Sequence, residues 1–323
     1  MTAEMTAAPL APATARAIEA TGLDVPDVVR VVRAALAEDF RYGADVTSVA
    51  TVAGRTLTAD VVAREPGVAA GLPVALAVLD LLGDYLTGGA GPGTAPDGSV
   101  AGEPTVLGTV LVADGTRVRP GDSVLRVSGD AVAVLGAERT MLNFLTHLSG
   151  IATATRTWAD AIAGTGAVVR DTRKTLPGLR GVEKYAVRCG GGENHRMGLG
   201  DAALVKDNHV AAAGGVAAAV RAVRAAACPG LAIEVECDSV AQVREALAAG
   251  ARFILLDNMS VPELRAAVAV ARDYAGVRLE ASGGLRLAGA REVAETGVHY
   301  LSVGALTHSS RVLDLGLDYS GAG

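Results

Sequence analysis

The chain has 323 residues, 50% of them hydrophobic and 20% charged, so it can bury the core of one large domain or of two ordinary ones. Its formal net charge of -6 argues against nucleic acid or an anionic membrane as a general partner. The three cysteines form no CxxC pair, which argues against a disulfide framework and a zinc site. The start of the chain lacks the basic and apolar pattern of a signal peptide, and no apolar run is long enough to span a membrane. Together these features predict a cytoplasmic protein.

The amino-terminal part of the chain is expected to mix helices and strands. Residues 1–26, rich in Ala, Thr and Pro, are expected to form a flexible leader. A helix follows, because Val28, Val32 and Leu36 recur at helical spacing after Pro26. Apolar and turn patterns then predict a strand at 57–64, an apolar helix at 72–82, a surface loop at 88–104 and short strands over 106–134.

A regular alternation of strands and helices begins after Glu138. The first element is a helix with Leu142, Leu145, Leu148 and Ile151 on one stripe. The nearly all-apolar strands are expected at 167–173, 203–206, 232–237, 253–257, 277–281 and 300–303. Helices are expected between them at 216–227, 240–249, 261–274 and 288–295. This pattern predicts a parallel sheet covered on its outer side. We favour an incomplete, TIM-like α/β barrel of about six strands over an open doubly wound sheet.

Polar residues and glycines follow the carboxyl end of every expected strand. In chain order they are Arg173 and Lys174, Lys206 and Asp207, Glu236, Asp257 and Asn258, Ser282 with Gly283 and Gly284, and Gly304. An α/β barrel has its active site at the carboxyl ends of its strands. The coincidence of the six ends therefore predicts one cavity with cations, carboxylates and glycine turns at its mouth.

Residues 171–209 concentrate positive charge inside an acidic chain. This stretch holds Arg173, Lys174, Arg180, Lys184, Arg188, His195, Arg196, Lys206 and His209. Arginine offers a planar fork to carboxylates or phosphates, and lysine offers a point charge, so the cluster favours a small, strongly anionic ligand. Two alternatives stay open: lysines that are ion-paired to nearby carboxylates, and a Schiff-base lysine of the aldolase kind.

Each remaining feature has a functional and a plainer interpretation. The three glycines at 190–192 before His195 and Arg196 can bring backbone close to a ligand, or form a simple loop with structural histidines. Glu236 and Asp257 can bind sugar hydroxyls, hold Mg²⁺ or stabilise positive charge on a ribose carbon, or act as counter-ions to lysines.

Two more features concern phosphate and the oligomer. The glycine turns after the last two expected strands resemble the phosphate cup of many barrels, although each could be an ordinary turn. Arg139 lies near the start of an apolar helix, where a cation opposes the helix dipole. It is either an exposed arginine or one that reaches a ligand in another subunit.

With these residues in view, the sequence resembles the quinolinate phosphoribosyltransferases, the carboxylating nicotinate-nucleotide pyrophosphorylases. The matching motifs run in order over about residues 27–319. They are EDFRYGADVTS (38–48), ERTMLNFLTHLSGIAT (138–153), DTRKTLPGLR (171–180), GGGENHRMGL (190–199), LVKDNH (204–209), IEVEC (233–237), ILLDNM (254–259), EASGG (280–284) and SVGALTHS (302–309). The leader and the Gly/Pro-rich segment 88–104 carry no family motif.

The resemblance implies a two-domain fold and a defined reaction. An α/β sandwich domain would span 27–137, with 307–323 returning to it, and an incomplete α/β barrel would span 138–306. The implied reaction transfers phosphoribosyl from phosphoribosyl pyrophosphate to quinolinate with Mg²⁺, and gives nicotinate mononucleotide, pyrophosphate and CO₂ on the route to NAD. The family works as a homodimer or higher oligomer with an active site shared between subunits.

The resemblance also implies residue roles. The quinolinate carboxylates would be held by Arg173, His195, Arg196 and Lys206, with Arg139 from the neighbouring subunit and Thr172 beside them. Catalytic roles fall on Lys174, Glu236 and Asp257, with Lys174 facing pyrophosphate and the two carboxylates facing the ribose. Mg²⁺ would be held mostly through substrate, with Glu236 and Asp257 as candidate ligands. The 5′-phosphate would be bound by Ser282, Gly283, Gly284 and Gly304.

Three rival functions remain at this point. One is a paralogous pyrophosphorylase-like protein acting on another base, as found beside molybdenum transporters. The second is a non-catalytic protein that binds a phosphate ligand on a barrel scaffold. The third is a Schiff-base aldolase that uses Lys206.

Overall fold

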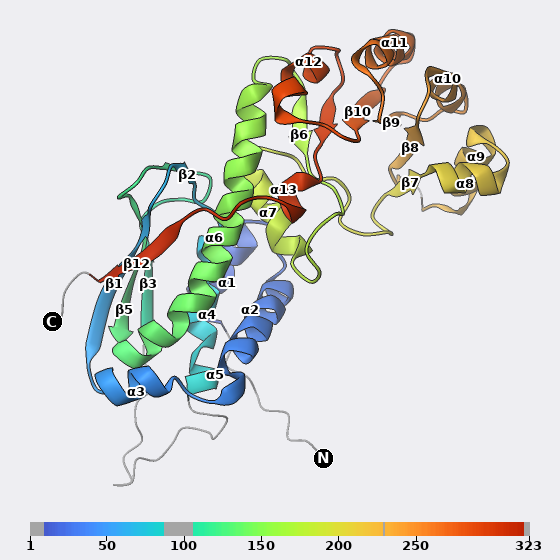
Figure 1. Cartoon of the computed structure of the whole chain (residues 1–323). Coiled ribbons are helices and arrows are strands. Elements are labelled where there is room, and N and C mark those ends of the chain that lie inside the picture. Colours follow the sequence, from blue (N-terminus) through green and yellow to red (C-terminus); the bar gives the residue numbers. More distant parts are fainter. Residues whose placement is uncertain (1–9, 87–105, 229, 320–323) are drawn as a thin grey trace, which may run out of the picture. The chain divides into compact units, whose positions relative to one another are not determined.

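The structure, a computed structural model, describes residues 10–86, 106–228 and 230–319 (Figure 1). The predicted surface loop at 88–104 lies outside the described residues. The chain divides into two compact units: a first unit of Met1–Thr153, Pro177–Cys189 and Ser310–Gly323, and a second unit of Ala154–Leu176 and Gly190–Ser309. The domain boundary expected at residue 138 falls inside a single helix, α6 (Ala131–Ala161), because the apolar stripe of this helix starts before Glu138.

The first unit contains an antiparallel sheet. Its strand order is β12-β1-β5-β3, with β1 (Thr56–Ala63), β3 (Val106–Val110), β5 (Ser123–Asp130) and β12 (Leu315–Tyr319). In β1, Val61 faces Leu125 on one side and Leu317 on the other. Segment 307–323, expected to return to this domain, thus supplies an edge strand. A small second sheet joins β2 (Gly67–Val68) to β4 (Arg117–Val118).

Helices complete the first unit. They are α1 (Pro12–Ala20), α2 (Val25–Asp39), η1 (Phe40–Tyr42), α3 (Val46–Val52), α4 (Leu72–Leu81), α5 (Gly83–Leu86), most of α6 and α7 (Arg180–Cys189). The expectation of a flexible leader over 1–26 is wrong for α1, whose Ile18 is fully buried. Buried Val28, Val32 and Leu36 confirm the helical stripe of α2, which begins after the capping carboxylate of Asp24.

The second unit contains a six-stranded parallel sheet in the order β6-β11-β10-β9-β8-β7. Its strands are β6 (Val168–Arg170), β7 (Ala203–Val205), β8 (Ile233–Cys237), β9 (Phe253–Asp257), β10 (Arg278–Ser282) and β11 (Tyr300–Ser302). The first strand pairs with the last, which a curled sheet allows and a doubly wound sheet does not. On its other side β6 bridges through Arg170 to Glu193. The predicted incomplete barrel of six strands is confirmed.

Helices connect the parallel strands and lie along their outer side (Figure 1). They are α8 (Asp207–Ala213), α9 (Val216–Ala226), α10 (Val240–Ala248), α11 (Val261–Ala271), η2 (Leu287–Gly289) and α12 (Ala290–Ala294). A last short helix, α13 (Ala305–His308), follows β11. The core is built from small aliphatic side chains such as Val235, Ile254 and Leu279. Among the described residues, no helix combines the length and the apolar character that a membrane span requires.

Candidate active site at the mouth of the barrel

The second unit holds twelve of the thirteen residues that we expected in the site. They lie at or just beyond the carboxyl ends of the parallel strands, or just beyond the bridge at Glu193, and comprise Thr172, Arg173, Lys174, His195, Arg196, Lys206, Glu236, Asp257, Ser282, Gly283, Gly284 and Gly304. Arg139 belongs to the first unit, on α6, with two-thirds (67%) of its side chain exposed. All of the expected site residues except Arg139 therefore belong to the mouth of the barrel.

Two guanidinium groups lie close together at this mouth. Burial and the positive charge of Arg173 lower the pKa of Arg196. The Nη1 of Arg196 donates to the Ala202 carbonyl at 2.9 Å. Its Nε is buried and has no hydrogen-bond partner among the residues that the structure describes. A buried donor beside a second cation is stabilised by an anionic ligand, which would satisfy the donor and screen the repulsion.

Thr172 and Lys174 converge on Gly304. The backbone N–H of Lys174 donates to Thr172 Oγ1 at 3.0 Å. A Cβ on Gly304 would lie 3.1 Å from Lys174 Cδ and 3.3 Å from both Thr172 Oγ1 and His308 Nε2. Gly304 has an ordinary helical φ of -65°, so close approach, not backbone strain, requires glycine here. The strand ends of β6 and β11 thus form one cradle lined by a lysine and a hydroxyl.

Lys206 and Glu236 form an ion pair across neighbouring strand ends. The Nζ of Lys206 lies 3.3 Å from Glu236 Oε2, and about half (48%) of the lysine side chain is exposed. His209 Nδ1 accepts the backbone N–H of Lys206 at 2.9 Å, which holds the start of α8. The Glu236 side chain is only 16% exposed, so Lys206 is the member of the pair that solvent and a ligand reach more easily.

Asp257 and the glycine turn after β10 also lie side by side. Ser282 pairs with Asp257 in the parallel register of β9 and β10. Gly283 and Gly284 both have left-handed backbone, with φ of +89° and +60°, which suits glycine. A carboxylate and a glycine turn thus share one edge of the mouth.

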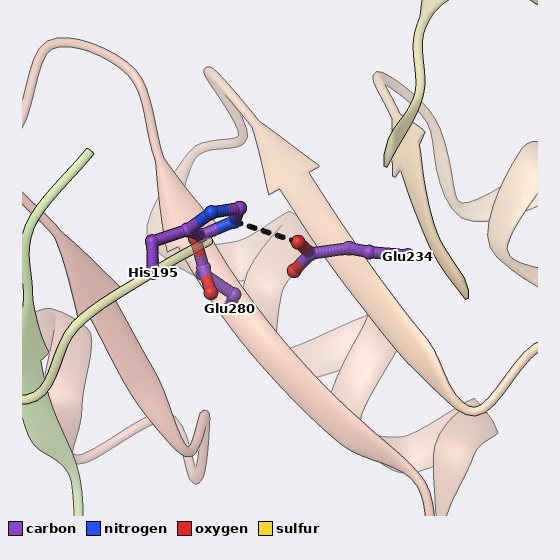
Figure 2. Close-up of side chains that lie close together, drawn as sticks. All are labelled: His195, Glu234 and Glu280. Carbon is purple, nitrogen blue, oxygen red and sulfur yellow. Dashed lines mark hydrogen bonds and ion pairs between the residues drawn. The ribbon is translucent and has the colours of Figure 1, made fainter. Parts of the chain in front are cut away.

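His195 points into the barrel interior, to a buried cluster of charged side chains that we did not predict (Figure 2). Its Nε2 lies 2.7 Å from Glu234 Oε2 and 3.6 Å from Glu280 Oε1. Its Nδ1 accepts the backbone N–H of Arg196 at 2.8 Å. An accepting Nδ1 requires the proton on Nε2, so His195 donates to Glu234. The predicted contact of His195 with a substrate carboxylate stays a prediction.

The cluster of His195, Glu234 and Glu280 has ligand atoms close enough to hold a metal ion, but Arg170 already supplies a cation. Arg170 Nη1 lies 2.6 Å from Glu280 Oε2, and its guanidinium stacks 4.5 Å from the centre of the Tyr300 ring. Burial and the nearby Glu234 raise the pKa of Glu280. We therefore interpret the cluster as an ion-paired support under the mouth and not as a metal centre.

Asp171 holds the segment that carries His195 and Arg196. Its carboxylate is fully buried and accepts from the His195 backbone N–H at 2.8 Å and from Asn194 Nδ2 at 2.5 Å. This role of Asp171 was not predicted from the sequence, nor were the roles of Glu234 and Glu280. A usable signal existed: Glu234 lies two residues before Glu236 on β8, so the two side chains share one face of the strand.

Known proteins resemble this chain along most of its length. A family model described as "Quinolinate phosphoribosyl transferase, N-terminal domain" matches residues 45–149, and one described as the C-terminal domain matches 151–318. A "Nicotinate-nucleotide pyrophosphorylase [carboxylating]" of Mycobacterium leprae (strain TN) is 53% identical over 290 residues, covering 89% of this chain and 95% of that protein. A "Probable nicotinate-nucleotide pyrophosphorylase [carboxylating]" of Bacillus subtilis (strain 168) is 37% identical, covering 87% and 89%.

A solved structure, the nicotinate-nucleotide pyrophosphorylase from Francisella tularensis, superposes with a TM-score of 0.81 at 36% identity, covering 92% of this chain and 98% of that one. The fold and the mouth define an α/β-barrel protein with a cationic site at its strand ends. Within that class, the chain belongs to the quinolinate phosphoribosyltransferase family.

Proposed function

We propose that this protein transfers the phosphoribosyl group of phosphoribosyl pyrophosphate to the ring nitrogen of quinolinate and releases CO₂ from the 2-carboxylate. The products are nicotinate mononucleotide, pyrophosphate and CO₂, in de novo NAD biosynthesis. The observation that carries the proposal is the pair Arg173 and Arg196, in which the buried Nε of Arg196 has no hydrogen-bond partner within the described part of the chain. Kinship with carboxylating pyrophosphorylases of similar length supports the same reaction.

The residues at the mouth divide the work between two anionic substrates. Arg173, Arg196 and Lys206 offset the charge of a dicarboxylic acid that would otherwise repel a polyphosphate sugar. Lys174, which approaches Gly304, faces the pyrophosphate, and Thr172 beside it lines the quinolinate pocket. The glycine turns at Gly283, Gly284 and Gly304 bind the 5′-phosphate. Glu236 and Asp257 bind ribose hydroxyls and stabilise the positive charge that develops as pyrophosphate departs. The quaternised ring nitrogen of the product can accept charge from the leaving carboxylate, so we assign no catalytic base to decarboxylation.

Magnesium belongs to the same proposal. Glu236 and Asp257 are carboxylates at adjacent strand ends, and their oxygens are the donors that Mg²⁺ prefers. They would hold the ion together with the substrate. When bound, Mg²⁺ supplies charge neutralisation for the departing pyrophosphate.

We also propose a homodimer or higher oligomer in which Arg139 reaches the partner's site. Support comes from the exposure of this arginine, whose Nη2 lies 3.8 Å from Glu138 Oε1. Such a long, exposed pair leaves the guanidinium available. We propose the cytoplasm as the compartment, which is consistent with three cysteines that are all free thiols.

The test is release of labelled CO₂ from 2-carboxyl-labelled quinolinate by the purified protein with phosphoribosyl pyrophosphate and Mg²⁺. We expect CO₂ and nicotinate mononucleotide in equal amounts, and none when phosphoribosyl pyrophosphate is omitted. Turnover of a different base alone would instead identify a paralogous pyrophosphorylase. Binding of both substrates without turnover would identify a non-catalytic binding protein, and trapping of Lys206 by borohydride with a carbonyl substrate would identify an aldolase.

A further inference from the structure

Asn258, directly after β9, has an unusual backbone conformation. Within residues 10–86, 106–228 and 230–319 it is the only non-glycine residue with positive φ, at 54°. Asparagine tolerates this left-handed region better than most side chains, but glycine adopts it more readily. Backbone geometry alone would therefore favour glycine at this position. The presence of asparagine must have a cause other than its backbone conformation.

The side chain of Asn258 contacts two parts of the mouth. Its Nδ2 donates to Asp257 Oδ2 at 2.8 Å. The amide orientation is fixed, because a carboxylate accepts and therefore requires the nitrogen to face it. On the other side, Asn258 Oδ1 occupies the space where a side chain of Gly283 would start. The backbone N–H of Asn258 donates to the Ser282 carbonyl at 2.9 Å, which extends the pairing of β9 with β10.

We infer that Asn258 is a positioning residue that ties the ribose-binding carboxylate of Asp257 to the phosphate-binding turn at Gly283. One amide thus fixes the rotamer of the carboxylate and the path of the glycine backbone together. Asn258 therefore affects the binding of the sugar phosphate and does not affect the cations that face quinolinate. This inference rests on the proposed function of the site.

A merely structural role makes the opposite prediction. If Asn258 were present only because it tolerates positive φ, Asn258→Gly would keep or improve stability and leave the kinetics unchanged. If Asn258 positions Asp257, the Asn258→Gly variant folds normally and loses affinity for phosphoribosyl pyrophosphate. Asn258→Asp provides a second test, because aspartate also tolerates this backbone but replaces the donor with an acceptor.

The experiment measures KM for phosphoribosyl pyrophosphate, with Mg²⁺ present, in both variants, and the dissociation constants of each substrate by calorimetry. We expect a KM increase of about tenfold for Asn258→Gly, the lower end of the effect of a hydrogen bond to a charged group. Asn258→Asp should show a larger increase, because it adds a negative charge beside Asp257. Quinolinate affinity should change by less than about twofold, a difference smaller than one ordinary hydrogen bond.

Ser260→Ala is the matched control. Ser260, two residues beyond Asn258, caps α11 together with Glu263. In the described structure its side chain makes no hydrogen bond to Asp257 or Gly283. Its loss should lower the melting temperature and leave KM unchanged. An active wild-type protein whose Asn258→Gly variant keeps its KM, or loses affinity for both substrates equally, would overturn the inference. A wild-type protein without phosphoribosyl transfer would overturn the proposed function instead, whatever the variants bind in calorimetry.

Discussion

Arg196 is a cation that the folded protein holds in an unfavourable environment. Its pKa is lowered by burial and by Arg173, and its Nε lacks a partner among the described residues, so the folded protein holds this cation at a cost. Binding a carboxylate removes part of that cost. Under the proposed function, part of the folding energy spent on holding this cation is recovered as affinity for quinolinate.

We predict that Arg196→Ala raises KM for quinolinate by about 10- to 100-fold, the range for a lost hydrogen bond to a charged group. Steady-state assays with quinolinate and with a monocarboxylate pyridine analogue provide the comparison. The loss should be larger for quinolinate, because the analogue lacks one of the carboxylates. Equal losses for both acids would contradict a direct contact, and KM for phosphoribosyl pyrophosphate, expected to stay constant, is the internal control.

The cysteines give a second residue-scale prediction. Burial raises the pKa of Cys189 to about 12 and that of Cys237 to about 12, whereas Cys228 is exposed. At pH 8 each buried thiol is about 10⁻⁴ thiolate, the reactive form. Iodoacetamide at pH 8 should therefore label Cys228 first, as read by peptide mass spectrometry. Denatured protein should label all three, and rapid labelling of native Cys237 would contradict the burial.

At the scale of elements, α6 contains a glycine that is required for packing. Alanine normally stabilises a helix interior by about 1 kcal/mol relative to glycine. At Gly150, however, a Cβ would collide with the Arg311 carbonyl oxygen and lie 2.9 Å from Val312 Cα. The carboxyl-terminal segment crosses α6 here, and the Leu313 N–H donates to the Thr146 carbonyl at 2.9 Å.

We therefore predict that Gly150→Ala lowers the free energy of unfolding by about 2 kcal/mol or more, as expected for overpacking against backbone. Urea denaturation measures it. Gly136→Ala, in the same helix, is the control, because its Cβ would meet only the side chains of Phe40, at 3.3 Å, and Leu86. That variant should be close to neutral. A stabilised Gly150→Ala protein would show that the crossing segment moves aside easily.

Some helices and strands of this protein were predictable from the sequence, and others were not. The strands of the second unit were predictable because they are short, apolar and separated by amphipathic helices. Helix α7 was not, since Glu183 and Lys184 are fully buried there and disturb the apolar pattern. Helix α1 was hidden by its Ala- and Thr-rich composition. Strand ends predicted which residues gather at the mouth, but not that His195 turns inward to Glu234, which depends on a partner 39 residues away.

At the scale of the whole molecule, the proposed shared site makes a prediction about mixtures. Arg139→Ala and Lys174→Ala should each be inactive alone. After subunit exchange, half of the dimers are mixed and one of their two sites is intact, so activity should recover to about a quarter of wild type. Labelled CO₂ release measures the recovery. Exchange verified by native mass spectrometry without any recovery would refute a shared site, and each variant incubated alone is the control.

The pairing of β12 with β1 has a consequence for how the protein is made. The ribosome synthesises β1 early, but the edge strand that pairs with it, Leu315–Tyr319, is translated only after the entire parallel sheet. The first unit must therefore wait, with one flank of β1 unpaired, while the second unit can complete its own strand ladder. An open flank invites association with other nascent chains, so we expect truncations before β12 to aggregate through the amino-terminal half.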